Sequence, residues 1–239
     1  MIVRPRPTCC AATVVGVETI ALAEVAAVLA DPSRAAMCLA LLDGRAWTVG
    51  ELARAAGIAP STASEHVSRL REAGFVAGVK QGRHRYLRIT DPRVAELIEH
   101  LAQHAEHRAA TGLRGSLRVR RLAYARSCYD HLAGTVGVAL HDGMVRSGLV
   151  DTAGGLALTG RGRAVLGDLG VPIPSGRRQA LRACLDWTER RDHLGGAVAA
   201  GLFARGVEAG WFERGTDRAV RLTAAAAEPL RALGVELPV

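Results

Sequence analysis

The sequence predicts a mainly α-helical protein with small β-hairpins, of the α+β class. Three observations carry this prediction. Two short amphipathic segments stand before two alternating segments between Thr48 and Thr90, apolar helical stretches precede them, and the second half contains an imperfect repeat. At 239 residues the chain is long enough for one large domain or two ordinary ones.

The first amphipathic segment has the start and stop signals of a short helix. Thr48 stands at the N-cap position, and Glu51 three residues later completes a capping box. Gly57 supplies the stop. The apolar positions at helical spacing are Val49, Leu52, Ala53 and Ala56.

The second segment begins near Ser61, after Pro60, and ends before Gly74, which predicts a second helix. Residues 75–79 and 84–89 then alternate as in the two strands of a hairpin, joined by a cationic connection that turns on Gly82. The pattern predicts a helix-turn-helix followed by a hairpin, and the second helix of such a motif enters the major groove of DNA.

Side chains suited to DNA contacts occur at two places in this segment. The second helix begins with short polar residues, as expected where base edges are read, and basic residues follow one turn later and at the hairpin tip. The predicted base-reading residues are Ser61, Thr62, Ser64, Glu65 and His66. The predicted phosphate contacts are Arg69, Lys80, Arg83 and Arg85, with His84 beside them in the tip. A helix pair and hairpin used only for packing would leave these polar groups without a role.

Residues 19–107 resemble the winged helix-turn-helix of the ArsR/SmtB family of bacterial transcriptional regulators. The resemblance rests on the turn at 31–34 (DPSR), the run at 49–53 (VGELA), the helix end at 70–74 (LREAG) and the Gly-Arg pair in the wing. It implies a homodimer on a palindromic operator in double-stranded DNA, with the apolar helix at 19–30 in the dimer interface. It also implies a repressor that responds to an effector.

The family's metal sites are only partly represented. The best known is a cysteine-containing segment on the first helix of the motif, but residues 51–56 contain neither cysteine nor histidine. A second family site uses acidic and histidine residues on the last helix. In the predicted helix at 92–108, His100 and His104 are four residues apart, so both can face one ion such as zinc. The alternative is a solvated polar face of a dimer helix.

Composition supports a polyanionic partner. The net charge is +8, and cations that neutralise phosphates release counterions. Lys80 is the only lysine and asparagine is absent, so part of the arginine excess reflects a GC-rich genome. No apolar run reaches the roughly 20 residues of a membrane helix, which predicts a cytoplasmic protein without a membrane partner. Five cysteines do not form a secreted disulfide framework.

Residues 1–17 are expected to form an irregular arm, and residues 18–108 the DNA-binding and dimerisation domain. Cys9 and Cys10 in the arm are either incidental or ligands of a soft metal. Asp31 is predicted to cap the next helix. Cys38 in that helix is predicted to be a buried apolar side chain.

Residues 109–115 form the predicted linker to a C-terminal effector domain at 116–239. This domain contains two repeats, about 124–172 and 181–236, because DHLAGTVGVALHDGMVRSGLV from Asp130 aligns without a gap with DHLGGAVAAGLFARGVEAGWF from Asp192. Each copy is predicted as helix, strand pair and terminal helix, a winged-helix-like unit, and the two are expected to share one core. Gly134 and Gly196 fall inside the first helix, where a close neighbour would compensate their cost of about 1 kcal/mol.

The effector residues singled out here are Cys128, Asp130, His131, Cys184, Trp187 and His193. Cys128 and His131 are three residues apart and would share one face of a helix. Cys184 and His193 would lie about 13 Å apart on a helix. Paired across a pseudo-twofold axis, both cysteines and both histidines make a four-ligand site for zinc or another thiophilic metal. The alternatives are core cysteines with packing Asp-His pairs, and Trp187 as a pocket wall or a domain-interface anchor.

The sequence contains none of three common catalytic patterns: Gly-x-Ser-x-Gly, a phosphate loop and His-Glu-x-x-His. The protein is therefore predicted not to be an enzyme. The prediction is a sequence-specific transcriptional regulator, an ArsR-like repressor modulated by a metal or a small molecule. The alternatives are an architectural DNA-binding protein of low specificity without an effector, and a protein-interaction module.

Overall fold

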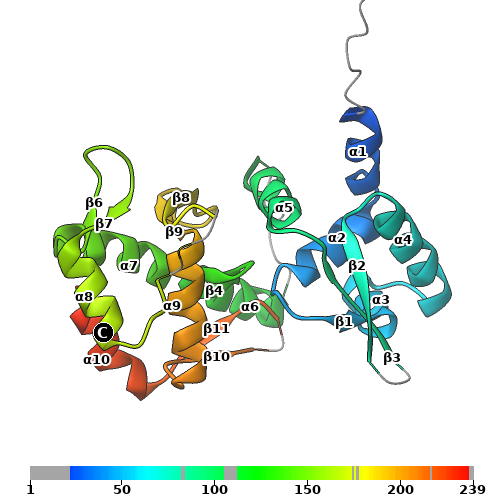
Figure 1. The fold of residues 1–239 in the computed structure, drawn as a ribbon. Coiled ribbons are helices and arrows are strands. Elements are labelled where there is room, and N and C mark those ends of the chain that lie inside the picture. The colour runs from blue at the N-terminus through cyan, green and yellow to red at the C-terminus, as the bar shows by residue number, and fades with distance from the viewer. Residues whose placement is uncertain are drawn as a thin grey trace, which may run out of the picture.

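The protein is described by a computed structural model that covers residues 22–81, 84–104, 112–173, 175, 178–215 and 217–236. The chain forms two halves, each with its own hydrophobic core, at opposite ends of the molecule (Figure 1). Among these residues, no helix combines the length and the apolar character needed to cross a lipid bilayer.

The N-terminal half is a winged helix-turn-helix. Its helices are α1 (Leu22–Leu29), α2 (Pro32–Leu41), α3 (Val49–Ala56), α4 (Pro60–Glu72) and α5 (Pro92–His104). Its strands are β1 (Trp47–Thr48), β2 (Val76–Gln81) and β3 (His84–Ile89), which form an antiparallel sheet of order β1-β3-β2. Apolar side chains from α2 to α5 and the sheet make the core, so the helix pair and the wing are fixed to one another.

The predicted helix caps are confirmed. Asp31 accepts hydrogen bonds from two backbone amides at the start of α2. Thr48 and Glu51 form the reciprocal capping box of α3, and these hydrogen bonds lower the pKa of the Glu51 carboxyl. Gly57 ends α3 in the left-handed region with φ 67°. Cys38 is fully buried, as predicted, and burial raises the pKa of its thiol to about 12.

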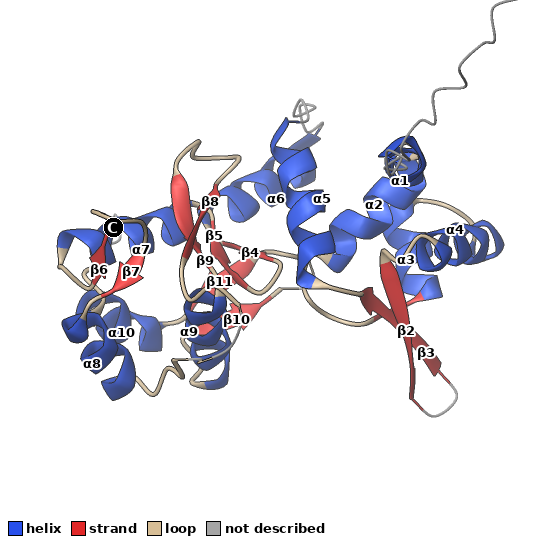
Figure 2. Ribbon diagram, turned by 45° about the horizontal axis from the view of Figure 1, so that its top comes forward, coloured by secondary structure: helices blue, strands red, loops and turns tan. Residues whose placement is uncertain are grey.

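Helix α6 (Gly112–Tyr124) leads into the C-terminal half, so the last four residues of the predicted linker, 112–115, are helical. The next elements are β4 (Arg126–Cys128), β5 (His131–Ala133), α7 (Thr135–Arg146), β6 (Val150–Asp151), β7 (Ala157–Leu158) and α8 (Gly160–Asp168). They are followed by β8 (Arg182–Leu185), β9 (Asp192–Gly195), α9 (Ala197–Glu208), β10 (Phe212–Arg214), β11 (Val220–Leu222), the 3-10 turn η1 (Ala224–Ala226) and α10 (Ala227–Ala232). The order hairpin, helix, hairpin, helix thus occurs twice, and α5 and α6 lie between the two halves in both views (Figures 1 and 2).

The predicted first helix of each copy is wrong at its start. The segments that contain the Asp-His pairs form the hairpins β4–β5 and β8–β9, and the helices begin only at Thr135 and Ala197. Three- and four-residue strands are too short to show an alternating pattern, which is why the sequence looked helical there. The predicted later elements are present as β6–β7 with α8 and as β10–β11 with α10.

Two glycines make the turn from hairpin to helix. Gly134 and Gly196 are the N-cap residues of α7 and α9, with φ of 82° and 99°, and are not inside the helices. The expected close approach is nevertheless present, because a Cβ on Gly134 would lie 2.5 Å from the carbonyl oxygen of Ala123. Only glycine fits this conformation and this space.

One core serves both element sets, as expected. Helix α7 packs against β9 and helix α9 packs against β5, so each helix covers the hairpin of the other set. The shared cluster includes Leu132 and Val136 from the first set and Leu194, Val198 and Phe203 from the second. Neither set therefore has a separate core.

Gly134→Ala is expected to lower the free energy of unfolding by about 1–3 kcal/mol, because alanine is strained at this backbone conformation and its methyl group meets the carbonyl of Ala123. Gly160→Ala at the start of α8 is the matched control, since a Cβ there meets no described atom within 4 Å. Urea unfolding of both variants measures the difference, and equal stabilities would contradict the role given to Gly134.

Candidate functional sites

The start of α4 presents most of the predicted base-reading residues to solvent. Pro60 occupies the first turn, and Ala63 and Val67 hold the helix against the core. The side chains left on the open face are those of Ser61, Thr62, Ser64 and Glu65. A short polar helix start on a fixed support is what direct contact with base edges requires.

His66 lies elsewhere. Its side chain is 15% exposed, and its Nδ1 lies 3.4 Å from Nη1 of Arg34 and 3.8 Å from Oδ1 of Asp31. His66 follows the buried Ala63 by three residues, so it sits at the edge of the buried face and links α4 to the start of α2. Its predicted role in base reading stays a prediction, and the structure adds these contacts within the domain.

The predicted phosphate contacts are partly described. Arg69 is exposed on α4, and Lys80 and Arg85 are exposed cross-strand partners on β2 and β3. Like charges directly opposite one another are unfavourable unless a negative partner faces them, as a phosphate backbone would. Arg83 and the side chain of His84 lie outside the described residues, so their roles stay predictions.

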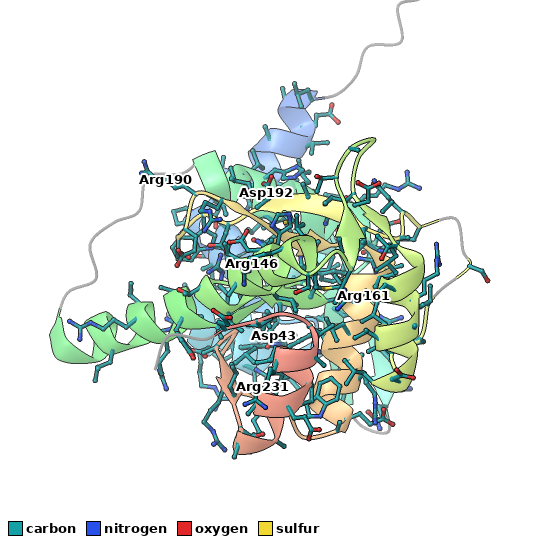
Figure 3. All side chains as sticks on the ribbon, turned by 90° about the vertical axis from the view of Figure 1, so that its left-hand side faces the viewer. Asp43, Arg146, Arg161, Arg190, Asp192 and Arg231 are labelled. Atoms are coloured by element: carbon teal, nitrogen blue, oxygen red, sulfur yellow. The ribbon has the colours of Figure 1, made fainter. Side chains whose placement is uncertain are left out.

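Positive charge alone does not locate the DNA. Arg146, Arg161 and Arg231 come from α7, α8 and α10 and lie at the surface of the C-terminal half (Figure 3). The arginine excess is therefore spread over the molecule, as the compositional bias predicts. The position of α4 and the wing carries the assignment.

Two further metal predictions fall largely outside the described residues. His100 is exposed on α5, but the side chain of His104 is not described, so the proposed pair stays a prediction. Cys9 and Cys10 also lie outside the described part of the chain.

The hairpins of the C-terminal half bring four ligating side chains together. One ligand atom each from Cys128, His131, Cys184 and His193 lies within 4.8 Å of the others, and all four residues are buried. Cys128 is the cross-strand partner of His131, and Cys184 that of His193, so each hairpin turns both of its ligands to the same side. Cys184 and His193, which a continuous helix would hold too far apart to share an ion, are brought side by side by the β8–β9 hairpin.

The two sulfurs lie close together, and so do two of the imidazole nitrogens. The two sulfurs are 3.8 Å apart, longer than the roughly 2.05 Å of a disulfide bond, and both cysteines are free. Nε2 of His131 and Nε2 of His193 are 3.2 Å apart. The hydrogen bond between the thiols raises the pKa of the Cys128 thiol and lowers the pKa of the Cys184 thiol.

A carboxylate stands behind each imidazole. Oδ1 of Asp130 lies 3.2 Å from Nδ1 of His131, and Oδ2 of Asp186 lies 3.4 Å from Nδ1 of His193. Burial lowers the pKa of His131, but its hydrogen bonds to Asp130 and Cys184 outweigh burial, and the pKa is raised. The hydrogen bond between Asp130 and Nδ1 of His131 fixes that ring and leaves its Nε2 directed at the cluster.

Asp186 is itself held by a buried ion pair. Burial raises the pKa of Asp186, but Arg126 and further hydrogen bonds bring it to about 2. Nη2 of Arg126 lies 2.9 Å from Oδ2 of Asp186, and Trp187 covers the same guanidinium at 4.5 Å. The structure therefore gives Trp187 a supporting role beside the cluster.

Residues that the sequence did not single out connect this cluster to the N-terminal half. Arg218 donates to Glu99 of α5 at 2.7 Å and to the carbonyl of Ser127, next to Cys128, at 3.0 Å. Arg182, which precedes Cys184 by two residues, pairs with Glu96 of α5 at 3.0 Å. The repeated Arg-x-Cys pattern at Arg126 and Arg182 was the available signal in the sequence.

The β4–β5 turn also touches the N-terminal half directly. Tyr129, between Cys128 and Asp130, packs against the core of the winged helix. It has φ 56°, a conformation that non-glycine residues rarely adopt, and its carbonyl oxygen lies 3.0 Å from where a Cβ on Gly44 would be. The turn that follows Cys128 thus contacts the core of the winged helix.

The fold and the recognition helix define a winged helix-turn-helix DNA-binding protein. Residues 29–79 match the family of helix-turn-helix domains. The chain is 39% identical over 207 residues to the uncharacterised HTH-type transcriptional regulator YdfF of Bacillus subtilis. The aligned region covers 84% of this chain and 92% of YdfF. It is 37% identical over 83 residues to the HTH-type transcriptional regulator CmtR of Mycobacterium tuberculosis, and this aligned region covers 35% of this chain and 70% of CmtR.

A solved structure of CmtR, titled a cadmium metal sensor, matches with 32% identity over 38% of this chain and 95% of that chain, at a TM-score of 0.31. The YdfF match is too long to fit within either half, so it extends into both. The chain belongs to the HTH-type transcriptional regulators, with an N-terminal domain of the ArsR/SmtB kind, and is not an enzyme.

Proposed function

We propose that this protein is a cytoplasmic, sequence-specific ArsR-like repressor that binds a palindromic operator as a homodimer. The exposed polar start of α4 on a tightly packed support is the observation that carries the proposal. Side chains of this kind discriminate bases, whereas a protein that binds any DNA needs mainly cations. The same observation disfavours an architectural protein of low specificity.

Exposed apolar residues on α1 and α5 support dimerisation. No residue of α1 is buried in the described chain, although the helix is strongly apolar. Leu22 is 69% exposed on α1 and Leu101 is 49% exposed on α5. A second copy that covers both helices would place two α4 helices in successive major grooves of a palindrome.

The C-terminal half is the proposed effector domain, built from two winged-helix-like copies. A thiophilic metal would use the cluster of cysteines and histidines. A small-molecule effector would instead occupy an open cavity of about 680 Å³ beside α3, whose charged lining residues are Arg45, Glu51, Arg54, Arg118 and Asp217.

Selection of duplexes from a random library, followed by titration at several salt concentrations, tests the function. Thr62→Ala is expected to lose about 1–3 kcal/mol of discrimination at one base position, because a base contact is lost. Lys80→Ala is expected to weaken all duplexes alike and to lower the salt slope by about 1, because a phosphate contact is lost.

Arg161→Ala is the matched control, since Arg161 is an exposed arginine on α8 of the C-terminal half. It should leave both quantities unchanged. Failure to enrich any sequence would contradict a specific regulator, and an unchanged salt slope in Lys80→Ala would contradict the wing assignment.

Leu101→Arg is expected to shift the protein from dimer to monomer, because a charge then lies in the proposed interface on α5. Leu185→Arg serves as control, since Leu185 is similarly exposed but lies on β8. Sedimentation velocity at matched concentrations gives the masses. A dimer that survives Leu101→Arg would place the interface elsewhere.

A further inference from the structure

We propose that one zinc-class ion binds Cys128, His131, Cys184 and His193 in a closed tetrahedral site, and that this ion fixes α5 and thereby sets the affinity for DNA. The inference rests on the proposed function for its second part only. The site itself stands on the geometry of the C-terminal half.

The sulfur–sulfur distance and the nitrogen–nitrogen distance fit the edges of a tetrahedron. With Zn–S bonds of about 2.3 Å and Zn–N bonds of about 2.0–2.1 Å, tetrahedral angles place the sulfurs about 3.8 Å apart and the nitrogens about 3.3 Å apart. The corresponding distances are 3.8 Å between Cys128 and Cys184 and 3.2 Å between His131 and His193. These two distances match the sulfur–sulfur and nitrogen–nitrogen edges of such a site, and all four ligand atoms lie within 4.8 Å of one another.

The donor set selects the class of ion. Two thiolates and two imidazoles in tetrahedral arrangement are typical of zinc, and also suit cadmium and cobalt(II) as soft or borderline ions. All four residues are buried, and the cysteines pack with Ala133, so no position is left open for water or substrate. Such a closed site holds structure together and does not carry out catalysis.

The surroundings are built for a cation. Asp130 and Asp186 each stand behind one histidine, so both copies contribute a cysteine, a histidine and a carboxylate. Nδ1 of His193 has no hydrogen-bond partner among the described residues, although Asp186 lies 3.4 Å away. Without an ion, two sulfurs and two nitrogens face one another in a buried space and must share protons to avoid repulsion.

The ion would join segments far apart in the chain. Cys128 and Cys184 are 56 residues apart and come from different hairpins, so each copy supplies half of the ligands. The hairpins carry the residues that contact α5. Arg218 joins Glu99 to the backbone beside Cys128, and Arg182 joins Glu96 to the strand that carries Cys184.

Loss of the ion would therefore release the support of α5. Glu99 is 4% exposed, and its carboxylate is paired with Arg218 at 2.7 Å, so displacement of Arg218 would leave a buried carboxylate without this partner. Tyr129 adds a contact from the same turn to the winged-helix core. Because α5 is part of the proposed dimer interface, its position controls how two recognition helices are spaced on DNA.

Metal titration of the reduced full-length protein tests the site. Cobalt(II) should bind one ion per chain with the absorption of a tetrahedral thiolate complex, and zinc should displace it. Cys38→Ser should bind normally, because Cys38 lies in the other core, whereas Cys128→Ser should lose the thiolate bands. No stoichiometric uptake by the reduced protein, or a Cys128–Cys184 disulfide as the stable form, would overturn the site.

Asp130→Asn keeps the test decisive if Cys128→Ser fails to fold. It is expected to weaken metal affinity about 10–100-fold, because His131 loses its orienting carboxylate. Asp142→Asn is the matched control, since Asp142 also lies 3.2 Å from the Nδ1 of the histidine before it, His141, but outside the cluster. Equal metal affinities in the two variants would contradict the role of Asp130.

The regulatory part is tested with a duplex selected in vitro, comparing zinc-loaded and chelator-stripped protein. The dissociation constant should differ about 5–150-fold between the two states. Glu99→Gln should reduce this ratio, and Glu208→Gln, which alters an exposed pair with Arg205, should not. A ratio of one with intact metal binding would overturn the coupling alone, whereas absence of DNA binding in both states would overturn the proposed function and leave the site to the cobalt titration.

Discussion

Two thiols and two imidazoles face one another in a buried space, and this constraint organises the C-terminal half. Their convergence is unfavourable unless protons or a cation lie between them, because buried polar atoms need partners. The hairpins, the glycine turns and the buried Arg126–Asp186 pair all serve to hold these four side chains in place. A cation at the centre satisfies every one of the converging atoms at once.

The proposed metal site would explain why the order of elements occurs twice. One hairpin supplies only one cysteine and one histidine, so neither copy can complete a tetrahedral set. Each helix packs on the hairpin of the other copy, which keeps the two pairs of ligands opposed. The arginines two residues before each cysteine have different partners. Arg126 pairs with Asp186 inside the domain, and Arg182 pairs with Glu96 of α5.

Most of the N-terminal half could be predicted from the sequence because its signals are local. The capping box at Thr48 and Glu51 and the left-handed Gly57 are visible within a few residues and are present in the structure. The start of the recognition helix could be predicted for the same reason. Helical spacing alone does not show that Asp31 and Arg34 lie beside His66.

In the C-terminal half, the sequence showed which positions of the two copies correspond, but it did not predict the hairpin that begins each copy. Comparison of the copies singled out Cys128, His131, Cys184 and His193, whose ligand atoms the structure brings together, yet it assigned them to helices. Strands of three or four residues are too short to show an alternating pattern. The turn at Tyr129 has a positive φ, which tyrosine rarely adopts, so the sequence does not predict it. The contacts of Arg218 with Glu99 join residues 119 apart and left no local signal.

X-ray absorption spectroscopy of the zinc-loaded full-length protein tests the central claim most directly. We expect two sulfurs at about 2.3 Å and two nitrogens at about 2.0–2.1 Å as the nearest neighbours of the zinc, with the outer scattering of imidazole rings. Nearest neighbours of oxygen and nitrogen without sulfur would place the ion elsewhere, for example on the histidines of α5, and would contradict the assignment of Cys128 and Cys184 as ligands.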